Sequence, residues 1–145
     1  MRLWKMILTV VAVTLFNINV AFGIVQCEVK EVLKIVDGDT IDVMIDIGFE
    51  TYRKIRVRFN GINTPESRTR DLREKELGLK AKAFTTDFLS RAKKITLKID
   101  KKEKFGRYLG KIYNERGECL NDALLGAGLA RIYHGEKRGP WFDDK

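Results

Sequence analysis

Histidine, cysteine and proline are scarce in this chain, and each scarcity narrows the chemistry that it can perform. The 145 residues include one histidine, two cysteines and two prolines. His134, Cys27 and Cys119 are too few and too widely spaced for a zinc site, and a hydrolase built on histidine is poorly supported. Export would permit a disulfide, but the separation of the two cysteines in the sequence leaves open whether they pair.

The chain also lacks internal repeats and low-complexity linkers, so its length fits one domain with a modest core. Hydrophobic residues make up 44% of it and charged residues 33%, which is typical of a soluble globular protein. The net charge of +8 favours a polyanionic partner, either nucleic acid or an anionic membrane surface. Charge alone does not distinguish such a protein from an ordinary basic domain.

Residues 1–23 differ in kind from the rest. Two basic residues precede an apolar run over residues 6–16, and small residues stand at positions 21 and 23. This pattern predicts a cleaved signal peptide and a secreted or periplasmic protein. An uncleaved membrane anchor is the alternative, because residues 6–25 are long enough to span a bilayer, although Asn17 and Asn19 oppose it.

Alternating apolar and polar residues predict the strands. A first stretch covers residues 32–47, with a glycine between two acids that predicts a bend or bulge at Gly38. Further strands are expected at residues 53–62, 95–100 and 108–113. On the stretch at residues 53–62, Arg58 falls on the polar face of the strand, and such a residue is usually solvated.

Two helices are expected between and after these strands. One begins near residues 74–77 and ends at about residue 93, and the other, near residues 120–125, has Asn121 as its N-cap. The order predicts an α+β fold, a small five-stranded OB-like β-barrel with two or three helices, spanning residues 28–136 before a tail at 137–145. Periodicity alone leaves another α+β arrangement open.

Three short segments concentrate acids and arginines. Residues 36–40 read V-D-G-D-T, residues 58–66 read R-F-N-G-I-N-T-P-E, and residues 104–107 read K-F-G-R. Cleavage of a phosphodiester requires neutralisation of the phosphate in the transition state and an activated water. Oxygen ligands for a hard cation, guanidinium groups and a carboxylate together supply these functions.

In order and spacing, these segments resemble the staphylococcal nuclease (thermonuclease) family, whose marks are D-G-D-T, R-x-x-x-x-D-T-P-E and Y-G-R. The resemblance covers residues 32–133. It implies a monomeric, calcium-dependent endonuclease that acts on DNA and/or RNA with little sequence preference and leaves 3′-phosphate ends. It also implies that Glu66 holds the attacking water, and that Arg58 and Arg107 clamp the phosphate.

For the metal, the resemblance implies that Ca²⁺ is held by Asp39, by residue 63 and by the backbone carbonyl of Thr64, with Asp37 in a supporting place. The family has a carboxylate at position 63, whereas this chain has Asn63. An amide oxygen can ligate calcium, but the site loses one negative charge, so we expect weaker metal binding or a different metal preference. The alternative is a non-catalytic module on the same barrel that binds nucleic acid or protein.

The C-terminus departs from the family as well. The chain after Tyr133 is too short for the family's usual final helix, so residues 135–145 are expected to form an irregular tail that packs through Trp141 and Phe142.

Overall fold

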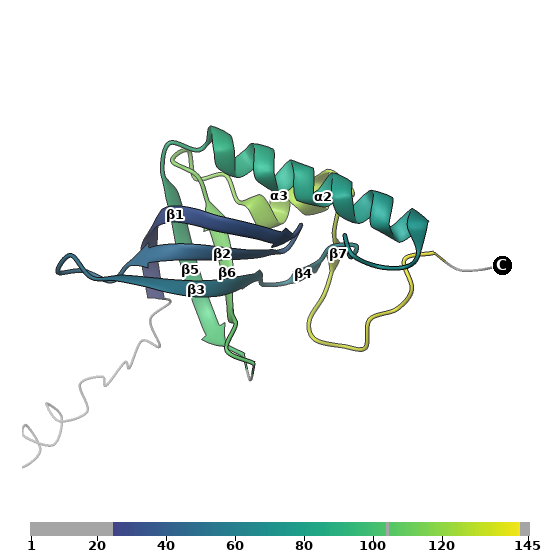
Figure 1. The fold of residues 1–145 in the computed structure, drawn as a ribbon, viewed down its shortest axis with the longest axis horizontal. Helices are drawn as coiled ribbons and strands as arrows, with labels where there is room; N and C mark the ends of the chain where they lie inside the picture. The colour runs from purple at the N-terminus through teal and green to yellow at the C-terminus, as the bar shows by residue number, and fades with distance from the viewer. Residues whose placement is uncertain (1–24, 104, 143–145) are drawn as a thin grey trace, which may run out of the picture.

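A closed β-barrel forms the body of the computed structural model, which describes residues 25–103 and 105–142 (Figure 1). Its five strands follow the order β1-β2-β3-β6-β5, and two helices lie against it, so the predicted α+β barrel is confirmed. The short strands β4 and β7 pair separately. The elements are β1 Val25–Asp37, β2 Thr40–Asp46, β3 Tyr52–Phe59, β4 Ile62–Asn63, α2 Leu72–Arg91, β5 Ile95–Lys102, β6 Tyr108–Tyr113, α3 Leu120–Gly126 and β7 Arg131–Ile132.

Strand β1 closes the barrel because it bends. Its first residues, from Val25 to Val29, pair with β5, and the remainder pairs with β2 as far as Asp37 opposite Thr40. Three register shifts along the pairing with β2 bend the strand between its two partners, as bulges do in small barrels. The predicted bend at Gly38 is therefore the tight turn between β1 and β2.

The barrel interior is filled by the apolar residues that alternate along the strands. Those with essentially no exposed surface include Ile41, Val43, Val57, Leu97 and Ile112. Strands β3 and β6 pair in parallel, and the other neighbours in the barrel are antiparallel. Burial of this set supplies the main driving force for folding.

Helix α2 lies across one end of the barrel and contacts β1 and α3 (Figure 1). It begins at Leu72, earlier than predicted, because Asp71 caps it: one carboxylate oxygen accepts from the N–H groups of Arg73 (2.9 Å) and Glu74 (3.3 Å). Its buried residues are Gly78, Ala81, Thr85 and Leu89. The small residues among them let the helix approach the loops of the barrel closely.

Helix α3 corrects the prediction that Asn121 is an N-cap. The helix begins at Leu120, its N-cap is Cys119, and Cys119 makes no side-chain cap bond. Asn121 lies inside the helix, and its buried side-chain amide forms hydrogen bonds with the backbone of the barrel. Its Nδ2 donates to the carbonyls of Asn60 (2.9 Å) and Gly110 (3.3 Å), and its Oδ1 accepts from the N–H of Ile112 (3.3 Å). Barrel contacts thus determine its role, although its residue type suits a cap.

Both cysteines are free, which answers the question that the sequence left open. Cys27 lies on β1 and Cys119 at the start of α3, each partly buried, and this burial raises the pKa of both thiols. Within the described residues, no helix is both long enough and apolar enough to cross a membrane. The predicted signal peptide or anchor at residues 1–23 lies outside the described residues.

Candidate active site

The turn that carries Asp39 is held in place by helix α2. Thr85 Oγ1 donates to the carbonyl of Gly38 at 2.6 Å. A Cβ atom on Gly38 would lie 2.7 Å from Cβ of Ala81, which is closer than side chains pack, so glycine is required where the turn meets the helix. Helix and turn together fix where Asp39 points.

Asp39 is a buried carboxylate that is bonded at both oxygens. It is only 4% exposed. Its Oδ1 accepts from Thr40 Oγ1 at 2.9 Å, and its Oδ2 accepts from the backbone N–H of Thr64 at 3.0 Å. An unpaired buried charge is costly, and Nη1 of Arg58 lies 3.4 Å from Asp39 Oδ2, so the two buried groups form an ion pair.

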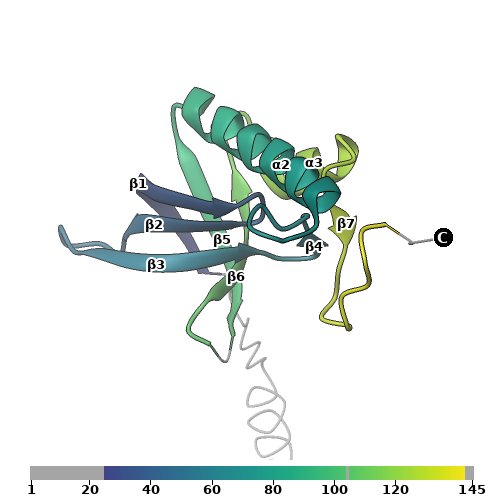
Figure 2. The same cartoon turned by 45° about the vertical axis from the view of Figure 1, so that its right-hand side comes forward.

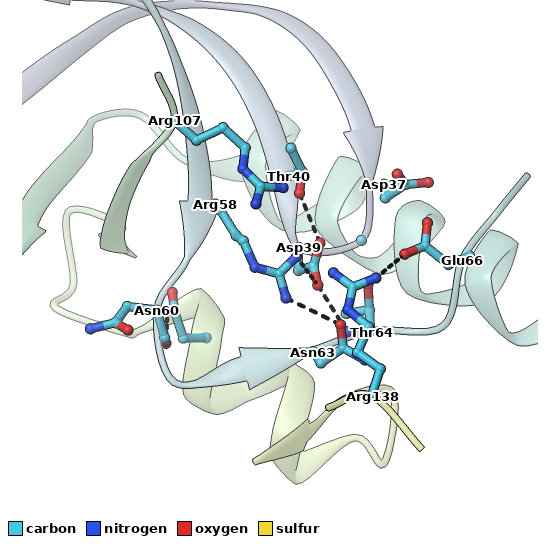
Figure 3. A network of polar contacts seen from close by, with 12 residues as sticks. Asp37, Asp39, Thr40, Arg58, Asn60, Asn63, Thr64, Glu66, Arg107 and Arg138 are labelled. Carbon is cyan, nitrogen blue, oxygen red and sulfur yellow. Dashed lines mark hydrogen bonds and ion pairs between the residues drawn. The ribbon is translucent and has the colours of Figure 1, made fainter. Parts of the chain in front are cut away.

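Arg58 is also buried, although strand alternation placed it on a polar face. It is 4% exposed, and its Nη2 donates to Oδ1 of Asn63 at 3.1 Å (Figure 3). Its guanidinium carbon lies 5.4 Å from the centre of the Tyr133 ring. Asp39, Asn63 and Tyr133 therefore hold the guanidinium in one orientation before any substrate arrives.

Strand β4 positions the next two residues. Asn63 pairs with Arg131 of β7, which joins this part of the site to the chain near its C-terminal end. Both Asn63 and Thr64 are buried. The hydroxyl oxygen of Thr64 is a buried polar atom that has no hydrogen-bond partner within the described part of the chain.

The loop that follows carries Glu66 to the rim and rests on α2. A Cβ atom on Gly78 would lie 2.5 Å from the backbone carbonyl carbon of Glu66. Position 78 of the helix must therefore be glycine, because the loop crosses the helix there. The N–H of Glu66 donates to Glu74 Oε1 at 3.1 Å. Asp37 accepts from the hydroxyl and the backbone N–H of Ser67, which ties the same loop to the end of β1.

The Glu66 carboxylate faces solvent and an arginine from far along the chain. Its side chain is 44% exposed, and Oε1 accepts a charge-assisted hydrogen bond from Nη1 of Arg138. Burial lowers the pKa of Arg138, but the Glu66 and Asp39 carboxylates raise it by more, and the net shift is upward. Arg138 therefore stays charged beside Glu66.

Arg107 lies on the side of Arg58 that is opposite Glu66. Its side chain is 33% exposed, and Nε donates to Glu103 Oε2 at 2.7 Å. A cavity of about 520 Å³ is lined by Arg58 and Arg107, and also by Phe105, Leu109 and Tyr133. The structure thus brings Asp39, Arg58, Asn63 and Thr64 into direct contact, and it brings Arg107 to the same cavity as Arg58 without joining it to that cluster (Figure 3).

The oxygen atoms around Arg58 are of the chemical types that ligate a hard cation. Asp39 supplies carboxylate oxygens, Asn63 an amide oxygen, and Thr64 a buried hydroxyl in need of a partner. Among residues 25–103 and 105–142, however, no three His, Cys, Asp or Glu side chains converge to hold a metal ion. The oxygen donors are therefore of the type that Ca²⁺ accepts, with one carboxylate, Asp39, among them.

Comparison with known families decides the assignment. A family model described as "Staphylococcal nuclease homologue" matches residues 56–143. The chain belongs to the staphylococcal nuclease family. The matched stretch contains Arg58, Asn63, Glu66 and Arg107, and it begins after the turn that carries Asp39.

Curated relatives of this staphylococcal nuclease homologue carry endonuclease names. Proteins named "Uncharacterized endonuclease" from Escherichia coli and from Escherichia coli O157:H7 are each 28% identical over 105 residues, which is 70% of this chain and 59% of the relative. "Endonuclease YhcR" from Bacillus subtilis (strain 168) is 31% identical over 107 residues, 69% of this chain and 8% of the relative. The chain therefore spans less than two thirds of the length of these relatives.

Two features of this family member were not predicted from its sequence. One is Arg138, which follows no strand or helix pattern and reaches Glu66 across 72 positions in the chain. The other is the contact of Arg58 with Asn63, which depends on the burial of both. A basic residue in a polar tail gives no local signal of the first contact, and the alternation of β3 gives none of the second.

Proposed function

We propose that this protein is a calcium-dependent nuclease that hydrolyses phosphodiester bonds of DNA and/or RNA with low sequence specificity and leaves 3′-phosphate ends. The observation that carries the proposal is the placement of Arg58 and Arg107 on the wall of one cavity, with the Glu66 carboxylate on the other side of Arg58. Two guanidiniums facing one space suit a phosphate, whose oxygens accept bidentate hydrogen bonds. Family membership and the endonuclease names of the relatives support the same class of reaction.

In this mechanism Arg58 is the fixed part of the phosphate clamp. Its orientation is set by Asp39, Asn63 and Tyr133, so no reorganisation is needed when charge grows on the phosphate. Arg107 leaves Glu103 to meet the phosphate from the solvent side. Together the two positive charges stabilise the transition state more than the ground state, because more negative charge is then in contact with them.

Glu66 supplies the base or the orienting group for water. Its carboxylate is half exposed beside the clamp, where it can hold a water and accept its proton. The new bond joins the water oxygen to phosphorus, the bond to the 5′ oxygen breaks, and solvent protonates the 5′ oxygen that leaves. With one histidine, His134, in the whole chain, a carboxylate is better suited to this role than an imidazole.

Calcium would be held by Asp39, Asn63 and Thr64. When bound, it would supply further positive charge at the phosphate. Because Asn63 is neutral, the site has one anionic side chain fewer than the pattern of the family, and we propose that it binds calcium more weakly.

The cavity also suits a nucleotide without selecting its base. Phe105 and Tyr133 offer aromatic surfaces next to the two arginines, and stacking on such surfaces tolerates every base. Contacts to phosphate carry no sequence information, so low specificity follows from the composition of this cavity.

The test is cleavage of heat-denatured DNA and of RNA by the purified protein, with calcium or with a chelator. Glu66→Gln, purified in the same way, controls for contaminating nuclease and should be slower by about 10²–10⁴-fold. If a polymerase extends the cleavage products only after phosphatase treatment, the products carry 3′-phosphate ends. Absence of cleavage at every calcium concentration and pH, together with salt-sensitive binding, would instead support the non-catalytic binding module.

We also propose that the protein is a monomer that acts outside the cytoplasm, as a secreted or periplasmic enzyme. The support is the signal-peptide pattern of residues 1–23. The mass of the protein recovered from its host tests this: loss of about 23 residues supports cleavage of a signal peptide. A full-length protein in the membrane fraction supports the anchor instead.

A further inference from the structure

The segment after β7 leaves the barrel and returns to the side of the candidate site (Figures 1 and 2). The described residues of this C-terminal segment, 133–142, form no helix or strand, and side-chain contacts hold them in place. Arg131 donates to the carbonyls of Pro140 (3.0 Å) and Trp141 (2.7 Å), and its guanidinium carbon lies 4.1 Å from the centre of the Trp141 ring. Arg73 of α2 lies over the ring of Phe142 at 4.8 Å.

This docking brings Arg138 into the site. Nη1 of Arg138 bonds Glu66, and its guanidinium carbon lies 6.0 Å from the centre of the Tyr133 ring. Arg58 lies 5.4 Å from the same ring. Two guanidiniums therefore share one tyrosine, and Arg138 lies beside the phosphate clamp, on the side that carries Glu66 (Figure 3).

The surroundings of Arg138 leave it able to bind a further anion. Its side chain is 40% exposed, and its ion pair with Glu66 uses a single nitrogen, Nη1. A guanidinium has five N–H donors, so others remain for a phosphate oxygen while the ion pair persists. Arg58 also lines the cavity, but it is more constrained than Arg138, because it is buried and each of its amino groups already lies near Asp39 or Asn63.

We propose that Arg138 is a third phosphate-binding arginine, which holds a phosphate of the polynucleotide next to Glu66. This inference rests on the proposed function, since it takes the substrate to be a nucleic acid. The C-terminal segment is then part of the substrate site, and it delivers one positive charge to the side of the clamp opposite Arg107.

Binding without cleavage tests this role. A fluorescently labelled single-stranded oligonucleotide is titrated with the full chain in chelator, over a range of salt concentrations, for the wild type, Arg138→Ala and Arg138→Lys. Lys137→Ala is the matched control, because it removes the same charge from the adjacent, exposed position of the same segment. Circular dichroism and thermal unfolding verify that each variant is folded.

The proposal predicts that Arg138→Ala binds about tenfold more weakly in ~0.1 M salt. The slope of log K against log salt should fall in magnitude by about 0.7, as expected for one lost contact to a single strand. Arg138→Lys should keep the slope, and Lys137→Ala should change it less than Arg138→Ala does.

Three results would overturn the proposal. Equal slopes of log K against log salt for Arg138→Ala and Lys137→Ala would mean that Arg138 acts only through its charge and not through a contact with the phosphate. Unchanged binding with faster calcium-dependent cleavage in Arg138→Ala would make the segment a cover over Glu66. A wild type that does not bind the oligonucleotide would leave no phosphate contact to assign. If binding behaves as predicted but calcium produces no cleavage, the nuclease proposal fails while Arg138 remains a phosphate-binding residue.

Discussion

The two sides of the candidate site are built differently. On one side, Asp39, Arg58 and Asn63 are buried at the rim of the barrel and bonded to one another. On the solvent-facing side, Glu66 and Arg107 flank Arg58 from opposite directions and are a third or more exposed. Each pairs with one residue, Glu66 with Arg138 and Arg107 with Glu103. The buried side is fixed before substrate binds, whereas the exposed side is free to rearrange.

This difference has an energetic cause. A buried ion pair that loses one partner leaves a charge in a medium that solvates it poorly, which destabilises the fold. An exposed charge that loses its partner is solvated by water instead. Residues of the buried side should therefore affect both stability and activity, and residues of the exposed side should affect activity alone.

The largest expected difference is between Arg58→Ala and Arg107→Ala. Each should slow cleavage by about 10²–10³-fold, because each removes a charge that stabilises the phosphate in the transition state. Only Arg58→Ala should also destabilise the fold, by about 3 kcal/mol, since it leaves Asp39 buried without its guanidinium. Urea unfolding measures the second effect, and equal losses of stability in the two variants would contradict the distinction.

The next largest effect on stability is expected at Asn121, whose hydrogen bonds join α3 to the barrel. Asn121→Ala should cost about 2 kcal/mol of stability, because it removes the bonds to Asn60 and Gly110 and leaves the N–H of Ile112 buried without a partner. Asp122→Ala is the matched control on the same helix, where the side chain is exposed, and should be nearly neutral. Similar unfolding midpoints in urea for the two variants would contradict the stabilising role of the contacts that Asn121 makes with the barrel.

The smallest effect is expected from an ion pair between β2 and β3, which joins Arg56 to Asp42. Arg56 lowers the pKa of Asp42 through two hydrogen bonds of 2.6 and 2.8 Å, which outweigh the opposing effect of burial. Because the folded pKa is depressed, this stabilisation is present above the unfolded pKa and is lost as pH falls through the folded one. Arg56 is half exposed, so the contribution should be at most ~1 kcal/mol.

Unfolding of the wild type and of Asp42→Asn is measured at neutral pH and at a pH well below the ordinary Asp value of about 4, where Asp42 is protonated in the folded protein too. The wild type should be the more stable protein at neutral pH, and the gap should close at the lower pH. A gap that is independent of pH would assign the stabilisation to packing instead of charge.

Local patterns in the sequence accounted for much of the barrel and for the segments of the site. Alternation identified the strands of the barrel, with Ile41 and Val43 among the buried residues, although β1 begins at Val25, before the predicted start at residue 32. The start of α2 was placed too late, because the apolar face begins several residues after the cap at Asp71. Asn121 was misassigned because an amide suits a cap and a barrel contact equally well, and only the fold brings Asn60 and Gly110 to it.

The charged contacts were harder to predict because they join distant segments. The burial of Arg58 depends on Tyr133 and Asn63, and no periodicity in β3 records either contact. Arg138 reaches Glu66 because Arg131 and Arg73 dock the residues that follow it, from Pro140 to Phe142. The roles of the metal ligands and of the catalytic residues remain predictions that measurement must test.

The most direct test of the account is the calcium dependence of DNA cleavage by the wild type and by Asn63→Asp. The account predicts that the wild type cuts heat-denatured DNA with calcium and stops with a chelator. It also predicts that Asn63→Asp reaches half its maximal rate at about tenfold lower calcium, because a second carboxylate strengthens the site. A wild type that is inactive at every calcium concentration, beside an active Asn63→Asp, would contradict the account and show that Asn63 has disabled the enzyme.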